Sequence, residues 1–125
     1  MTWNANSLNI PSKKLEFFDF LVTNKIDIAL VNETFLKQGT SFSHPEYKTY
    51  RLDRVGALTK GGVAIMVRQD LPHKLLPAFR TRILECIGVS VDSASGPIEF
   101  ISTYRPGGRS TITTISQNSK VMFFY

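Results

Sequence analysis

Two short polar segments of this chain contain residue types that bind metal ions or phosphate. Trp3-Asn4-Ala5-Asn6 lies at the start, and Asn32-Glu33-Thr34 follows the apolar run 28–31. A buried strand that ends on a carboxylate presents one charged group at the rim of a sheet, where the ligands of open α/β sheets bind. Glu33 is therefore a candidate metal ligand. The amides of Asn4 and Asn6 are candidates to hold that group or a phosphate oxygen.

Each of these residues also has a purely structural interpretation. A glutamate at the end of a strand is often a solvated turn residue. Asn4 and Asn6 can form turns, because asparagine tolerates tight backbone conformations and hydrogen-bonds its own backbone. Both interpretations therefore remain open at this point.

The elements that must position these residues follow from apolar periodicity. A strand is expected to end near Asn4, and a helix to begin at Pro11-Ser12, with Ser12 as its N-cap, and to end at Asn24. Three- and four-residue spacing predicts one apolar helix face, formed by Leu15, Phe18, Leu21 and Val22. Residues 26–31 then form a strand that is apolar on both sides. Strand, helix and strand in this order indicate a layered α/β fold.

The rest of the chain predicts shorter strands at 47–52 and 61–68, and a hairpin over 83–104 with its turn at 93–97. Gly61-Gly62 leads into a strand and lacks the lysine and hydroxyl residue of a phosphate-binding loop. After residue 106 the character changes, because 107–125 is rich in serine and threonine and has little apolar periodicity. We therefore predict one domain over 1–106 and a divergent tail over 107–125.

Composition sets wider limits. The chain has 125 residues, of which 42% are hydrophobic and 20% charged, as expected for one globular domain. Its net charge of +5 favours an anionic partner such as nucleic acid. A single cysteine excludes an internal disulfide. No segment has the length of a membrane span, so a membrane is not expected as a partner. A small-molecule cofactor is not expected either.

Four motifs in order resemble the endonuclease/exonuclease/phosphatase superfamily, and more closely the apurinic-endonuclease-like domain of jockey-type non-LTR retrotransposon polyproteins: Trp3-Asn4-Ala5-Asn6, Asn32-Glu33-Thr34, Gly61-Gly62-Val63-Ala64-Ile65 and Thr103-Tyr104-Arg105-Pro106. The segment 50–54 is also similar to that subgroup. The resemblance implies the N-terminal part of a four-layer α/β sandwich. It also implies hydrolysis of DNA phosphodiester bonds with Mg²⁺ or Mn²⁺, and action in the nucleus.

The resemblance assigns roles to four residues. Glu33 matches the metal-binding carboxylate, Asn4 the asparagine that orients the site, and Tyr104 the active-site tyrosine near the phosphate. Asn6 stands where some relatives use an aspartate on the metal. Tyr104 also fits a half-buried sheet aromatic. Several arginines fit either a DNA path or a solvated basic face: Arg51, Arg54, Arg80, Arg82, Arg105 and Arg109.

The resemblance ends near residue 106. Relatives continue with Gly-Asp-x-Asn and Ser-Asp-His motifs, whereas 107–125 contains no aspartate, glutamate or histidine. The two histidines, His44 and His73, lie outside the matching motifs and are expected in surface loops. We therefore expect a fragment of a retrotransposon endonuclease that does not cut efficiently by itself. The alternatives are a non-catalytic basic module that binds nucleic acid, and a phosphodiesterase of the same superfamily with another substrate.

Overall fold

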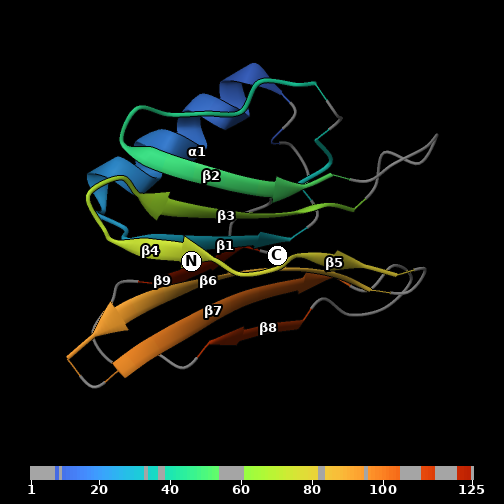
Figure 1. Cartoon of the computed structure of the whole chain (residues 1–125). Helices are drawn as coiled ribbons and strands as arrows, with labels where there is room; N and C mark the ends of the chain where they lie inside the picture. Colours follow the sequence, from blue (N-terminus) through green and yellow to red (C-terminus); the bar gives the residue numbers. More distant parts are fainter. Residues whose placement is uncertain are drawn as a thin grey trace.

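A computed structural model of the chain describes residues 8, 10–32, 34–36, 39–53, 61–81, 84–94, 96–104, 111–114 and 121–124. For Phe79, Tyr104 and the last two of these ranges it describes the backbone alone. Figure 1 shows a helix against one sheet and a second sheet on the other side of that first sheet. Within the described ranges, no helix has the length and hydrophobicity needed to cross a membrane.

Helix α1 (Pro11–Thr23) begins at Pro11, within the predicted start at Pro11-Ser12. Its N-cap is Ile10, which is extended and gives no side-chain capping bond, so the prediction of Ser12 as N-cap is wrong. Pro11 explains the difference, because its fixed φ suits the first helical position and it has no N–H to satisfy there. The end at Asn24 is confirmed, and its side-chain amide donates to the Phe20 carbonyl at 2.9 Å.

The buried face of α1 is centred on Phe17, Phe18 and Leu21. The predicted members Leu15 and Val22 are 64% and 37% exposed, so the expected face is wrong at these two positions. The aromatic pair Phe17 and Phe18 accounts for this, because burying both large rings turns the helix away from Leu15.

The first sheet has the strand order β2-β3-β1-β9. Strand β1 is antiparallel to β3 and parallel to β9. The bounds are β1 (Ile28–Asn32), β2 (Tyr47–Leu52), β3 (Val63–Arg68) and β9 (Val121–Phe124). The predicted strand at 47–52 is confirmed in full, and those at 26–31 and 61–68 each begin two residues later than expected.

The second sheet is antiparallel and has the order β4-β6-β7-β8, with β5 also paired to β6. Its bounds are β4 (His73–Leu75), β5 (Phe79–Arg80), β6 (Glu85–Ser93), β7 (Gly96–Tyr104) and β8 (Thr111–Thr114). The predicted hairpin is confirmed as β6 and β7, which pair from Glu85 with Tyr104 to Ser93 with Gly96. Strands β8 and β9 lie within the predicted tail, and the division at residue 106 stays a prediction.

Strand β1 is buried along its whole length, because it lies between two apolar layers. Ala29 and Val31 belong to the cluster under the helix, whereas Ile28 and Leu30 belong to the cluster between the sheets. The prediction of a strand that is apolar on both sides is therefore confirmed. The mixed helix and strand architecture with two facing sheets confirms the α/β fold class, and the described residues form three layers of the expected sandwich.

Tyr47 fixes the C-terminal end of α1 to the first sheet. Its hydroxyl lies 2.6 Å from the Ile26 carbonyl and 3.1 Å from the Leu21 carbonyl, and the residue is 4% exposed. Burial disfavours the charged phenolate, and this raises the pKa of Tyr47 to about 12. The neutral form is therefore part of the folded structure.

We expect the free energy of unfolding to fall between pH 10 and 12 because of Tyr47. Its pKa is higher in the folded than in the unfolded chain, so this contribution is complete below pH 10 and is lost as the pH rises through about 12. The loss is about 2 to 3 kcal/mol. Urea unfolding of wild type and Tyr47→Phe across this range measures it. An equally steep fall in the variant would contradict the assignment.

Candidate functional site

The ends of five strands meet at one end of the sandwich, on the right in Figure 1. Asn32 at the end of β1 and Leu52 at the end of β2 both pair with Val63 at the start of β3. In the second sheet, Glu85 at the start of β6 pairs with Tyr104 at the end of β7. We call this end of the molecule, at Asn32, Leu52, Val63, Glu85 and Tyr104, the site end.

The four predicted site residues fall at or beyond the limits of the described structure. Glu33 follows directly after β1, but Glu33, Asn4 and Asn6 lie outside the described residues. Tyr104 is the last residue of β7, and only its backbone is described. The structure therefore brings the strands that lead to Glu33 and Tyr104 to the same end, and the roles of all four residues stay predictions.

Both neighbours of Glu33 are buried and held by hydrogen bonds. Asn32 and Thr34 are 0% exposed, and the Thr34 amide donates to the Gly62 carbonyl at 3.3 Å. The next amide, of Phe35, donates to the Gly61 carbonyl at 3.0 Å. Gly61 and Gly62 have φ of 110° and 88°, which explains why glycine is required there.

Phe35 itself has a φ of 55°, which is uncommon for a bulky residue. Such strained positions persist only where the surrounding contacts fix them, and they cluster at functional sites. The backbone two residues after Glu33 is thus held in an unfavourable conformation by the Gly61 carbonyl.

A polar bridge joins the two sheets beside these residues. The Ser102 hydroxyl of β7 donates to Asn32 Oδ1 at 2.6 Å, and Asn32 Nδ2 donates to the Thr103 carbonyl at 3.2 Å. Ser102 and Asn32 are both 0% exposed. Because buried polar groups must be hydrogen-bonded to be tolerated, this bridge fixes the distance between the ends of β1 and β7.

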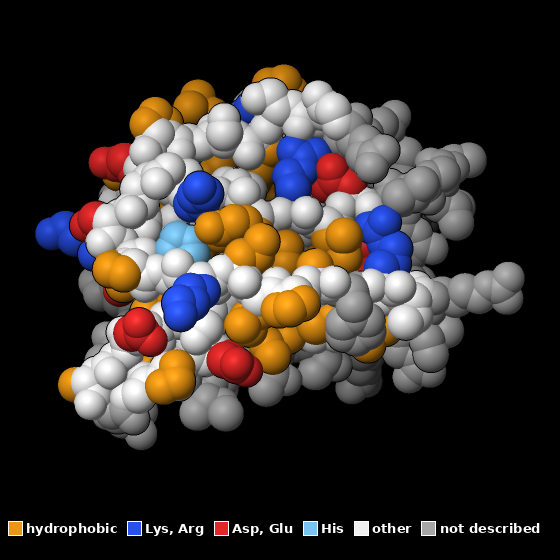
Figure 2. Space-filling model, in the orientation of Figure 1, with side chains coloured by type: hydrophobic (Ala, Val, Ile, Leu, Met, Phe, Trp, Pro, Cys, Tyr) orange, Lys and Arg blue, Asp and Glu red, His pale blue; other side chains and the backbone are white. Residues whose placement is uncertain are grey.

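Two ion pairs also lie at the site end. Arg51 donates to both carboxylate oxygens of Asp53, with its shortest contact at 2.7 Å. Arg80 contacts Glu85 at 3.2 Å and also donates to the backbone carbonyl of Asp53. The Glu85 side chain is only 3% exposed. Figure 2 shows basic and acidic side chains next to one another at this end of the molecule.

The histidines are less exposed than expected. Both are partly buried, and His73 lies in a strand, so the prediction of a loop is wrong for His73. His44 stacks on Phe18 with ring centroids 5.1 Å apart. His73 begins β4, and its Nε2 lies 2.8 Å from the Tyr50 hydroxyl while Nδ1 lies 2.8 Å from the Leu71 carbonyl. Since a carbonyl can only accept, a neutral His73 donates from Nδ1 to the Leu71 carbonyl and accepts the Tyr50 proton at Nε2.

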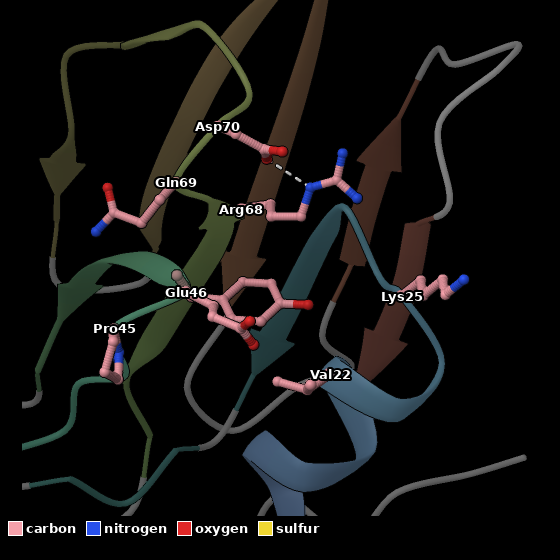
Figure 3. Close-up of a pocket in the computed structure, with 8 residues that line it drawn as sticks. Val22, Lys25, Pro45, Glu46, Arg68, Gln69 and Asp70 are labelled. Carbon is pink, nitrogen blue, oxygen red and sulfur yellow. Dashed lines mark hydrogen bonds and ion pairs between the residues drawn. The ribbon is translucent and has the colours of Figure 1, made fainter.

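A pocket of 380 Å³ lies at the opposite end of the first sheet, between the end of α1 and the end of β3 (Figure 3). Tyr47 and Val22 line it together with Arg68, which pairs with Asp70 at 2.6 Å and with Asp27 at 2.9 Å. This pocket contains none of the predicted site residues. The site end, rather than this pocket, is therefore the candidate site.

The residues of the site end limit what can bind a metal ion. No group of three histidine, cysteine, aspartate or glutamate side chains with metal-binding geometry occurs among the described residues. Asp53 and Glu85 pair with arginines, and the Asn32 amide is bonded to Ser102 and Thr103. A single strand-end carboxylate such as Glu33 nevertheless suits Mg²⁺, which takes one or two carboxylates and keeps several waters.

Comparison with known families agrees with this architecture. The profile described as the endonuclease/exonuclease/phosphatase family matches residues 1–117. The chain therefore belongs to the endonuclease/exonuclease/phosphatase family, whose members are generally metal-dependent.

The most similar individual proteins include polymerases of mobile elements. The chain is 27% identical over 104 residues to the RNA-directed DNA polymerase from mobile element jockey of Drosophila funebris, and 32% identical over 107 residues to the probable RNA-directed DNA polymerase from transposon BS of Drosophila melanogaster. Each match covers 83% of this chain but only 11% and 12% of the respective relative. The resemblance to jockey-type elements is thereby confirmed, and the chain spans about one ninth of the length of these relatives.

Sequence reasoning missed the residues that build the bridge and the buried ion pair. Asn32 was noted only as part of the motif Asn32-Glu33-Thr34, without a predicted role. Ser102 and Glu85 were not predicted to take part in the site. The burial of Glu85 could have been predicted from the alternation of its strand. Glu85, Ile87 and Val89 occupy alternate positions, so they face the same side. Nothing local indicates that Asn32 and Ser102 meet.

Proposed function

We propose that this chain is the N-terminal part of a retrotransposon endonuclease domain that binds DNA and a divalent cation at the site end. Glu33 holds Mg²⁺ or Mn²⁺, and Asn4 and Tyr104 contact the phosphate that is to be cleaved. Asn6 contributes at most a neutral amide to the cation. The observation that carries this proposal is the 3.2 Å hydrogen bond from Asn32 to Thr103, because it places the residues next to Glu33 and Tyr104 side by side.

The chemistry follows from these assignments. When bound, the cation offsets the negative charge that develops on the phosphoryl and leaving oxygens. The residues of this chain hold the cation, orient the phosphate and attract the DNA backbone through the net charge of +5.

We further propose that residues 1–125 do not cut DNA by themselves. The family resemblance calls for an aspartate that activates water and a histidine on the phosphate, and 107–125 contains neither residue type. Asp53 and Glu85 are poor substitutes, because each pairs with an arginine. Catalytic residues that act as a unit fail together when one is missing.

A second candidate function rests on the charge alone. With a net charge of +5, the chain could bind nucleic acid as a non-catalytic basic module. Binding of that kind depends on phosphate neutralisation and counterion release. It is therefore steeply salt-dependent and indifferent to Mg²⁺.

Fluorescence anisotropy with a labelled DNA duplex distinguishes the two functions. At fixed ionic strength, we expect Mg²⁺ to strengthen binding relative to an excess of EDTA, because the cation bridges Glu33 and a phosphate. A supercoiled plasmid incubated with the same protein and Mg²⁺ should stay intact. Binding that is equal with and without Mg²⁺ favours the basic module, and nicking of the plasmid by the wild-type chain would refute the proposed inactivity.

A further inference from the structure

We propose that Ser102 and Asn32 are positioning residues, which set the affinity of the cation at Glu33 without touching it. The inference rests on the proposed function, because it assumes that Glu33 binds a divalent cation. It adds a specific cause for the placement of that carboxylate. The cause is the buried bridge from Ser102 through Asn32 to the Thr103 carbonyl.

The bridge holds the Asn32 amide in one orientation. The Ser102 hydroxyl donates to Oδ1 at 2.6 Å, and the Thr103 carbonyl accepts from Nδ2 at 3.2 Å. Turning the amide over would place two acceptor oxygens, Oδ1 and the Thr103 carbonyl, against each other. Complete burial removes water as a substitute partner for Asn32 and Ser102. The side chain next to Glu33 therefore has a single satisfied arrangement.

The effect reaches Glu33 because the flanking backbone has few ways to adjust. Asn32 precedes Glu33 directly, and on the other side the Thr34 amide is bonded to the Gly62 carbonyl at 3.3 Å. Glu33 is covalently joined to both of these held residues, so we infer that its carboxylate depends on the bridge for its position. Residues that orient a metal ligand through hydrogen bonds contribute to affinity although they do not contact the ion.

The competing explanation is that the bridge only braces the two sheets. A brace contributes to the free energy of unfolding, as every buried contact does, but has no particular effect on cation affinity. Val89 offers a matched control, because it lies in the same apolar cluster between the sheets and pairs with Phe100 rather than with Ser102. We expect Val89→Ala to lower stability and to leave the bridge in place.

The test is titration of the full chain with Mn²⁺, followed by electron paramagnetic resonance at a temperature where every variant is folded. We expect Ser102→Ala to weaken Mn²⁺ binding by up to about tenfold. Tenfold is the lower end of the loss for a partner bonded directly to a metal ligand, and Ser102 acts one residue further away, through Asn32. Val89→Ala should bind as wild type does. Ser102→Thr, which keeps the hydroxyl, should recover most of the affinity.

If Ser102→Ala does not fold, Ser102→Cys keeps a side chain of the same shape, with a larger atom that donates more weakly, and it should bind Mn²⁺ less tightly than wild type. Equal affinities in the Ser102 variants and Val89→Ala, with binding still dependent on Glu33, would overturn the positioning role and leave the proposed function standing. Binding that does not depend on Glu33 would overturn both.

Discussion

Glu33→Gln is expected to weaken Mn²⁺ binding at least tenfold and to remove the effect of Mg²⁺ on DNA affinity. The substitution keeps the size of the side chain and removes its charge. At an effective dielectric constant of about 20, two unit charges about 4 Å apart interact by about 4 kcal/mol. A tenfold change corresponds to only about 1.4 kcal/mol, so the expected loss is a conservative figure. Electron paramagnetic resonance of bound and unbound Mn²⁺ measures it directly.

The matched control for this substitution is Glu99→Gln. Glu99 is exposed on β7, so its replacement changes the net charge by the same amount without touching the site end. We expect Glu99→Gln to bind Mn²⁺ as wild type does. Equal weakening in both variants would mean that the cation responds to overall charge, and the assignment of Glu33 as the ligand would then be wrong.

Phe100→Ala is expected to lower the free energy of unfolding by about 3 to 5 kcal/mol. Phe100 is 0% exposed in β7 and belongs to the cluster that joins the two sheets. Removing the ring leaves a cavity that neighbouring strands fill only in part. Because a whole domain is stable by only about 5 to 15 kcal/mol, much of the chain could unfold at room temperature. Urea unfolding followed by circular dichroism gives the value.

Two further variants serve as controls for the Phe100→Ala measurement. Phe100→Leu keeps most of the buried volume and should lose less than Phe100→Ala. Leu15→Ala removes a side chain that is 64% exposed and should change stability by no more than about 0.5 kcal/mol. A Phe100→Ala variant as stable as Leu15→Ala would show that the two sheets do not pack through this residue.

Local patterns of the sequence predicted the elements whose signals are long. The hairpin of β6 and β7 alternates apolar and polar residues over most of its length, and its turn is marked by Ser93-Ala94-Ser95-Gly96. The uniformly apolar β1 revealed burial on both faces. These signals are local, because the order of apolar and polar residues within a strand shows which of its faces are buried.

Pairings between distant segments were not predictable in the same way. Strand β9 pairs in parallel with β1, although the predicted tail showed little periodicity. The short strands β4 and β5 carry too few residues for alternation to be recognised. For the helix, the apolar residues were identified, but the choice of which ones to bury depended on the packing of the aromatic rings.

For the candidate site, the predicted roles of the residues came from the family resemblance, whereas the residues around them were found only in the structure. Glu33 and Tyr104 were predicted from motifs, and the strands that lead to them do end together. Asn32 and Ser102 are 70 positions apart in sequence, so their contact exists only after two sheets have faced each other. Reasoning from one sequence has no means of pairing such residues.

The hydrogen bond between Tyr50 and His73 lies where we expect the native molecule to open locally. It links β2 and β4, the outermost strands on one side of the two sheets. Strand β4 is held to β6 by only three paired residues, so little else secures that edge. Local opening starts where few bonds must break, and amide protons of β4 should therefore exchange with solvent before those of β1. We therefore expect the sandwich to open at this edge first, while β1, the strand that leads to Glu33, stays closed.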